Sequence, residues 1–294
     1  MSLSRKAILA CILGSLGLLS TEVFADTKAP VKPDSQAQNQ TEEKRKTLLA
    51  DATSAIQETQ NALKLLDDGN KKEALAALER ATGKLGIILA RDPSLTLAPA
   101  GVNVLTVDLQ GGIEMVKGLR KQIQDLIDAG RFQESRHLMG SLASETVVSV
   151  SNIPLATYPA AIKDAAKLID ENKIHEAKSA LQTALNTQVV TETIIPLPVV
   201  HAQVSLKEAE TLAEKKGRTS DDNTRLKAAL DNARGQLERA QALGYGKKSD
   251  FETFYQQLKE IEQKTADNKS GTGFFAKITA SITDFMTSSQ PHKP

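Results

Sequence analysis

Histidines and glutamates are the side chains of this sequence whose types and spacing come closest to a chemical site. The four histidines are His137, His175, His201 and His292, and none has a second histidine or a cysteine at zinc-ligand spacing. The sequence contains no G-x-S-x-G elbow, phosphate loop, dinucleotide fingerprint or H-E-x-x-H helix. We therefore predict no catalytic residue, no metal site and no cofactor. A pH-sensing role for the first three histidines stays open, because imidazole titrates near neutral pH.

Three glutamates recur in one sequence context, a pattern that could indicate carboxylate chemistry. Glu73, Glu134 and Glu176 each stand four residues after a glycine or an asparagine. That position falls in the first turn of a predicted helix, where a negative charge complements the helix dipole. We interpret the three glutamates as structural. Asn70 and Glu73 also form an expected N-cap pair.

The glutamates belong to a helical hairpin that occurs three times. Each copy turns at the same four-residue pattern: Leu66-Asp67-Asp68-Gly69, Ile127-Asp128-Ala129-Gly130 and Ile169-Asp170-Glu171-Asn172. Apolar residues recur at three- and four-residue steps around each turn, as in amphipathic helices. Nine residues after each turn comes a large apolar side chain: Leu78, Met139 and Leu181. We expect all three of these side chains to be buried.

The repeat predicts a mainly α fold of stacked antiparallel helical hairpins. A fourth, looser hairpin turns at Lys216-Gly217 and ends at Gly244. Residues 146–155 and 188–200 are rich in β-branched side chains, and proline closes each stretch. They form at most a short β ribbon at the Ile-Pro-Leu connectors, and unpaired extended connectors are the alternative.

The first 25 residues predict export. Arg5 and Lys6 precede an uncharged apolar run, and Val23-Phe24-Ala25 fits the small-x-small cleavage rule. An uncleaved anchor and lipidation at Cys11 are the alternatives. A signal of this style predicts the periplasm of a Gram-negative bacterium. Cleavage would remove the single cysteine of the chain, and with it any disulfide or thiol chemistry.

Beyond this signal peptide we expect four further parts. Residues 26–40 form a disordered leader, 41–264 one helical domain, 265–273 a linker and 274–294 an amphipathic tail. The tail carries a one-sided apolar stripe: Phe274, Phe275, Ile278, Ile282 and Phe285. Contact with a membrane surface or a partner protein is one interpretation of this stripe. Docking on its own bundle is the other, but we expect the rest of the protein to stay folded without the tail.

Composition argues against nucleic-acid binding. The formal net charge is +1, and the chain has 3 Tyr, 7 Phe and no Trp. A nucleic-acid binder would carry a basic surface and aromatic platforms on which bases stack.

Three segments in this order resemble the YfdX family of bacterial proteins: NIPLATYPAAIKDAAKLI, IIPLPVVHAQVSLKEAETLA and LKAALDNARGQLERAQALGYG. The resemblance runs from about Thr47 to Gly246. It implies a mostly helical, exported protein that is associated with acid, heat or other stress, with chaperone-like or small-molecule-binding behaviour. It supplies no catalytic motif.

Two functions follow as expectations. The first is a non-enzymatic periplasmic stress-protection protein that binds unfolded clients or other proteins. The second is a small-molecule-binding module, with a pocket at the connectors formed by Pro154, Tyr158, Pro196, Pro198 and His201. An enzyme of unrecognised type is a third and weaker alternative, and the oligomeric state stays open.

The signal peptide gives the first testable prediction. Intact-mass analysis of the exported protein should find a chain that begins at Asp26, because cleavage is expected after Ala25. A mature chain that retains Met1, or one lipidated at Cys11, would contradict it.

Overall fold

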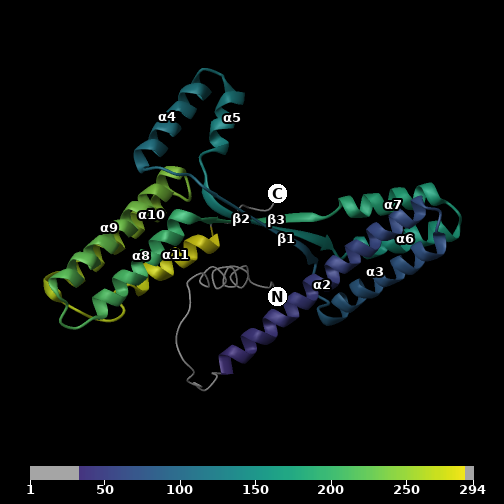
Figure 1. Cartoon of the computed structure of the whole chain (residues 1–294), viewed down its shortest axis with the longest axis horizontal. Helices are drawn as coiled ribbons and strands as arrows, with labels where there is room; N and C mark the ends of the chain where they lie inside the picture. The colour runs from purple at the N-terminus through teal and green to yellow at the C-terminus, as the bar shows by residue number, and fades with distance from the viewer. Residues whose placement is uncertain (1–32, 289–294) are drawn as a thin grey trace. The chain divides into compact units, whose positions relative to one another are not determined.

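The computed structural model describes residues 33–288, with side chains from residue 42 onward. The predicted signal peptide with Cys11, the first part of the leader and His292 lie outside this range. The described chain is mainly α-helical and contains a small three-stranded antiparallel sheet, as the sequence predicts (Figure 1).

The described chain divides into two compact units. The first unit comprises the residues up to Asn103 together with Ser149–Thr191, and the second comprises Val104–Val148 and the residues from Glu192 onward. The division falls inside all three strands, which are β1 (Leu97–Asp108), β2 (Ser144–Pro154) and β3 (Val189–Pro196), in the sheet order β1-β2-β3. The single domain expected over residues 41–264 is therefore replaced by two units. The hairpins pack in separate groups, which the repeat alone does not reveal.

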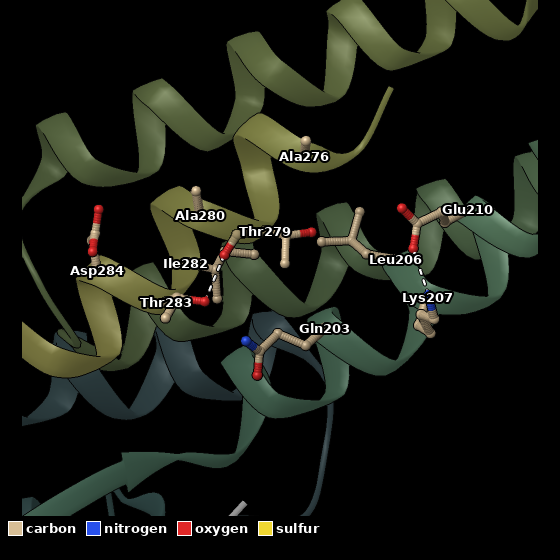
Figure 2. A pocket seen from close by; sticks show the side chains of 10 residues that line it. All are labelled: Gln203, Leu206, Lys207, Glu210, Ala276, Thr279, Ala280, Ile282, Thr283 and Asp284. Carbon is tan, nitrogen blue, oxygen red and sulfur yellow. Dashed lines mark hydrogen bonds and ion pairs between the residues drawn. The ribbon is translucent and has the colours of Figure 1, made fainter. Parts of the chain in front are cut away.

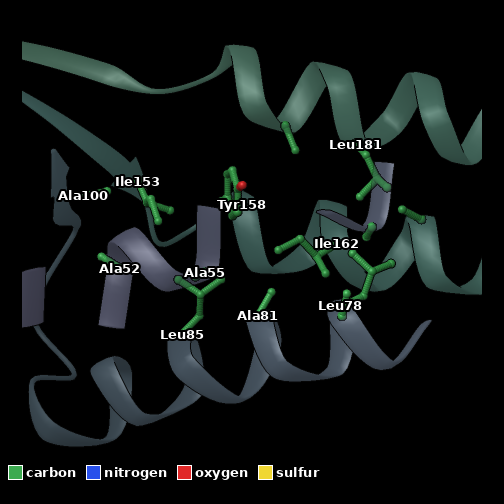
Figure 3. Packing of buried hydrophobic residues seen from close by; sticks show 14 of the residues in the cluster. Ala52, Ala55, Leu78, Ala81, Leu85, Ala100, Ile153, Tyr158, Ile162 and Leu181 are labelled. Carbon is green, nitrogen blue, oxygen red and sulfur yellow. The ribbon is translucent and has the colours of Figure 1, made fainter. Parts of the chain in front are cut away.

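Two of the three repeated hairpins form the first unit. They are α2 (Pro33–Asp67) with α3 (Lys71–Arg91), and α6 (Tyr158–Asp170) with α7 (Ile174–Asn186). α2 packs on α7 and α3 packs on α6, so the first helix of each hairpin lies against the second helix of the other. The four helices enclose one apolar cluster (Figure 3).

Small side chains dominate this cluster. Ala52, Ala55 and Ala81 are fully buried beside Leu85 in Figure 3, and Tyr158 is the one aromatic residue of the cluster. Alanine at helix contacts allows the two backbones to approach closely. The near-absence of aromatic residues before residue 250 is thus consistent with the packing of this unit.

The turns of the three hairpins share one hydrogen-bond pattern. Gly69, Gly130 and Asn172 all take positive φ angles, of 80°, 72° and 61°. In the first hairpin the amide of Asn70 donates to the carbonyl of Leu65 at 2.8 Å, and the amide of Gly69 donates to that of Leu66 at 3.2 Å. The other two turns repeat both bonds at the equivalent positions. This is the Schellman arrangement, in which a left-handed residue ends a helix.

The second unit contains the remaining hairpins. Its helices are α4 (Ile113–Asp128), α5 (Phe132–Gly140), α8 (Leu197–Glu214), α9 (Ser220–Leu243), α10 (Lys248–Thr265) and α11 (Ala276–Ser288). α9 packs against α8, α10 and α4, and α11 packs against α10 and α8. The predicted stop at Gly244 is a left-handed C-cap with φ 89°.

The C-terminal tail is part of this unit. Phe275, Ile278, Ile282 and Phe285 are buried, and Phe285 makes edge-on ring contacts with Phe251 and Phe254 at centroid distances of 5.7 Å. Of the two interpretations of the stripe, the packing supports docking on its own bundle, because the buried apolar side chains of α11 pack against α10 and α8. Phe274 is only half-buried and lies beside the Lys264 ammonium group.

Four local expectations also need correction. α2 begins at Pro33, so residues 33–40 of the expected leader are helical. Asn70 makes no side-chain cap, although Glu73 does lie in the first turn of α3. Met139 is exposed, whereas Leu78 and Leu181 are buried as expected. Strand β1 lies in a segment for which we expected no strand.

The buried tail generates a prediction that reverses our expectation that the tail is dispensable. Phe285→Ala should lower the free energy of unfolding by about 3–5 kcal/mol, because it leaves a cavity between Phe251 and Phe254. Phe274→Ala is the matched control and should cost less than about 1 kcal/mol. Urea unfolding measures both variants, and equal midpoints would show that the tail is not part of the core.

Candidate functional site

A run of exposed apolar side chains in the second unit lies on strand β1. Val104 is 58% exposed, Leu105 is 57% exposed, and Val107 is exposed as well. Neighbouring residues of a strand point to opposite faces, so this segment presents apolar side chains on both faces. We call residues 104–108 the exposed edge segment.

The exposed edge segment is paired on one side only. β1 is an outer strand of the sheet, and its neighbour is β2. The hydroxyls of Thr106 and Thr146 are 2.9 Å apart across this pair. No other described strand pairs with the outer edge of β1. An edge of this kind offers free backbone N–H and C=O groups to an added strand, and proteins usually protect such edges with charges, prolines or bulges. Residues 104–107 contain neither a charge nor a proline.

Tyr245 and Arg239 fix the end of the exposed edge segment. The hydroxyl of Tyr245 accepts a hydrogen bond from the amide of Ser144 at 2.9 Å and donates one to Glu145 Oε2 at 2.7 Å. Burial is the largest cause that raises the pKa of Tyr245, so the hydroxyl keeps its proton. The Arg239 guanidinium donates to the carbonyls of Leu109 and Gly111. The segment is therefore presented by a fixed backbone.

A second candidate is a groove of about 530 Å³ in the first unit, between α6 and α7. Its lining includes Tyr158, Asp164, His175 and Glu176. The Tyr158 hydroxyl is buried and has no hydrogen-bond partner of normal geometry among the described residues. Burial raises the pKa of Tyr158, and the Thr59 hydroxyl offsets this in part. A buried hydroxyl without a partner is a group that a polar ligand could satisfy.

A third hollow, of about 510 Å³, lies between α8 and α11 in the second unit. Figure 2 shows that the Lys207 ammonium group and the Glu210 carboxylate on its wall bind each other, at 2.8 Å. The Thr283 hydroxyl donates to the carbonyl of Thr279, also at 2.8 Å. Because these polar groups already have partners, this hollow is the weaker candidate.

The connector residues that we predicted as one pocket lie in different units. Pro154 and Tyr158 belong to the first unit, and Pro196, Pro198 and His201 belong to the second. Pro196 and Pro198 are buried, whereas His201 is exposed on α8. Tyr158 does line a groove, but the histidine in that groove is His175. The exposed edge segment was missed, although its β-branched residues Val104, Thr106 and Val107 were a readable signal, with Val102 shortly before them.

The histidines and acidic residues of the described chain form no metal cluster. No group of three or more histidine, cysteine, aspartate or glutamate side chains in this part of the chain could hold an ion. Glu134 instead pairs with Arg131, which lowers the pKa of Glu134.

Comparison with known sequences relates part of the chain to one family. Residues 55–194 match the family model described as YfdX protein. This region belongs to the YfdX family. The match covers hairpins α4–α5 and α6–α7 completely, as well as most of the sheet. It also covers α3 and the C-terminal part of α2. It does not extend over the segments from 195 to 246 that also contributed to the resemblance.

Other comparisons add little. A solved structure of Salmonella Typhi YfdX is similar at 13% sequence identity, over 51% of this chain and 92% of that one. The TM-score is 0.36, so the likeness carries no structural conclusion. The sequence matches no curated protein. None of the described helices is long and apolar enough to span a bilayer.

The two buried tyrosines give paired predictions. Tyr245→Phe should lower the free energy of unfolding by about 1–2 kcal/mol, because the buried amide of Ser144 loses its acceptor. Tyr158→Phe removes a hydroxyl that has no normal hydrogen bond and should leave stability unchanged or slightly higher. Urea unfolding of both variants tests this, and the reverse order of effects would contradict the assigned hydrogen bonds.

Proposed function

We propose that this YfdX-family chain is a non-enzymatic protein that binds extended segments of unfolded or partly unfolded proteins. The exposed edge segment of β1 is the observation that carries this proposal. A client strand would pair with the free backbone groups of β1 and would bury Val104, Leu105 and Val107 against its own side chains.

Apolar burial supplies the driving force for such binding. Transfer of apolar surface out of water is worth about 25 cal/mol per Å², and this gain does not depend on a particular client sequence. Backbone pairing is equally independent of client sequence, because every non-proline residue offers the same groups. The two contributions together suit a protein that protects many clients.

The proposed site of action is the periplasm, under stress. This part of the proposal is supported by the signal-like residues 1–25 and by the resemblance of the chain to the YfdX family. Without Arg5, Lys6 and Glu22 the chain carries equal numbers of basic and acidic side chains. In strong acid the carboxylates become protonated, so the remaining positive charges repel one another and loosen the packing. We propose that this loosening exposes further apolar surface for clients.

One carboxylate at a helix start resists this change. The Lys215 ammonium group and the amide and hydroxyl of Thr219 lower the pKa of Asp222 to about 2. The cap at the start of α9 therefore persists at a pH at which ordinary carboxylates are neutral. Under the acid hypothesis, hairpin α8–α9 is expected to be the last to lose its turn.

The alternative function is binding of a small molecule in the groove beside Tyr158. The Tyr158 hydroxyl, which makes no hydrogen bond of normal geometry, favours it, together with His175 and Glu176 in the lining of the same groove. A thermal-shift screen against metabolites separates the two functions. A ligand whose stabilising effect disappears in Tyr158→Phe would support the groove.

Client protection by the exposed edge segment is tested by light scattering. The double variant Val104→Lys/Leu105→Lys should lose suppression of a heat-unfolded client by at least about threefold, because lysine on an edge strand disfavours strand addition. Val204→Lys is the matched control, since Val204 is an exposed valine on α8. It should keep full suppression.

The same assay at pH 3 and pH 7 tests the acid hypothesis. Suppression should be stronger at pH 3, and client activity should recover after neutralisation. Equal suppression by the double variant and the parent at both pH values would contradict binding at β1.

A further inference from the structure

In the first unit two of the repeated hairpins pack on each other. The third repeated hairpin, α4–α5, lies in the second unit without such a partner hairpin in the described part of the chain. Hairpin α2–α3 packs on hairpin α6–α7 with exchange of helices, α2 on α7 and α3 on α6. This is the arrangement that a two-fold axis produces between identical objects. Hairpin α4–α5 has the same turn and register but lies in the second unit.

The positions that this packing covers can be counted from the turn residue. Three residues before the turn, Leu66 and Ile169 are buried, and nine residues after it, Leu78 and Leu181 are buried. Two residues after it, Ile174 packs against the core of the unit, while the Lys71 side chain contacts Asn172 of the other hairpin. These positions therefore lie at or near the contact between the two hairpins.

In α4–α5 the side chains two and nine residues after the turn are uncovered, whereas Ile127, three residues before it, is half-buried. Phe132, two residues after the turn, is 61% exposed, and Met139, nine residues after it, is 47% exposed. α9 holds the other end of the hairpin, where Val116 is buried against Leu243 and Arg120 donates to the carbonyl of Ala242 at 3.0 Å. The turn end of the hairpin and the outer side of α5 are left to solvent.

The charged side chains of α4–α5 indicate which partner its uncovered surface fits. In the first unit, Lys178 of α7 forms an ion pair with Asp67 of α2 across the two hairpins. The equivalent positions of α4–α5 are Arg136 and Asp128. A two-fold arrangement would place a second such pair between position 75 of α3 and position 170 of α6. These residues are Leu75 and Asp170, so the first unit has the ion pair only once. Hairpin α4–α5 carries both charges and is therefore complementary to itself.

We propose that α4–α5 is a self-association surface on which the α4–α5 hairpin of a second copy of this chain packs as α6–α7 packs on α2–α3. Phe132 and Met139 are buried in this contact. By two-fold symmetry, Arg136 of each copy pairs with Asp128 of the other, which gives two ion pairs. An interface of this kind is isologous, so it closes as a dimer.

Charge reversal with rescue tests the proposal on the purified full chain by sedimentation velocity. Asp128→Arg and Arg136→Asp should each weaken the dimer by at least about tenfold, because like charges then meet twice. The double variant Asp128→Arg/Arg136→Asp restores opposite charges and should dimerise again. An equimolar mixture of the two single variants should form a heterodimer, because each charge then meets its opposite.

Two control variants separate this contact from other effects. Asp125→Arg makes the same charge change on α4, but the equivalent Lys64 and Lys167 are exposed in the packed hairpins. It should leave the dimer intact. The edge variant Val104→Lys/Leu105→Lys should also remain dimeric, so a failure of client binding at β1 is distinguishable from a failure of this proposal. Circular dichroism confirms that each variant is folded.

Three outcomes would overturn the proposal. The parent protein could be monomeric throughout the micromolar range. The dimer could withstand both single charge reversals, which would place the contact on another surface. The single variants could be monomeric without recovery in the double variant or the mixture, which would exclude the Arg136–Asp128 pairing.

Discussion

A helix can reverse into an antiparallel neighbour within a few residues only if one residue of the turn accepts a left-handed backbone conformation. Gly69, Gly130 and Asn172 meet this constraint, and each is followed by the same pair of backbone hydrogen bonds. Glycine pays no steric cost there, and asparagine is the side chain that tolerates it next best. Once the turn is fixed, the register of both flanking helices is fixed with it. Every apolar face of the three hairpins depends on that register.

Local features of this fold could be predicted from the sequence because they depend on near neighbours. The turns, the helix periods, the first-turn glutamates and the left-handed end at Gly244 all belong to this class. Features that depend on distant partners could not be predicted. Met139 has the sequence context of Leu78 and Leu181, yet it is exposed because its hairpin lies in another unit. The apolar stripe of the tail had the pattern of a surface helix, and only the positions of α8 and α10 show that it is covered.

The candidate sites show the same limit. Tyr158 was identified from its place after an Ile-Pro-Leu connector, and it does line a groove. His201, which follows the next such connector, lies in the other unit and is exposed. Similar local sequence placed these side chains in different units, because the connectors end strands that enter different packing environments. The edge segment of β1 was missed for a related reason, since a strand becomes an edge only through the order of its neighbours.

The cores of the two units are also built from different side chains. The first unit packs alanine faces closely around a single tyrosine, and the second unit uses a cluster of three phenylalanine rings, one of them from the tail. The first unit is moreover discontinuous in sequence, because residues 104–148 separate its two hairpins. During synthesis or export, α2–α3 therefore emerges well before α6–α7, the hairpin that covers it. Closing a longer loop adds only a little entropy cost, so the final packing is not endangered. The consequence is a delay, during which the alanine and leucine face of α2–α3 stays uncovered on the nascent chain until α6–α7 arrives. A protein proposed to protect others therefore passes through a stage in which it needs protection itself.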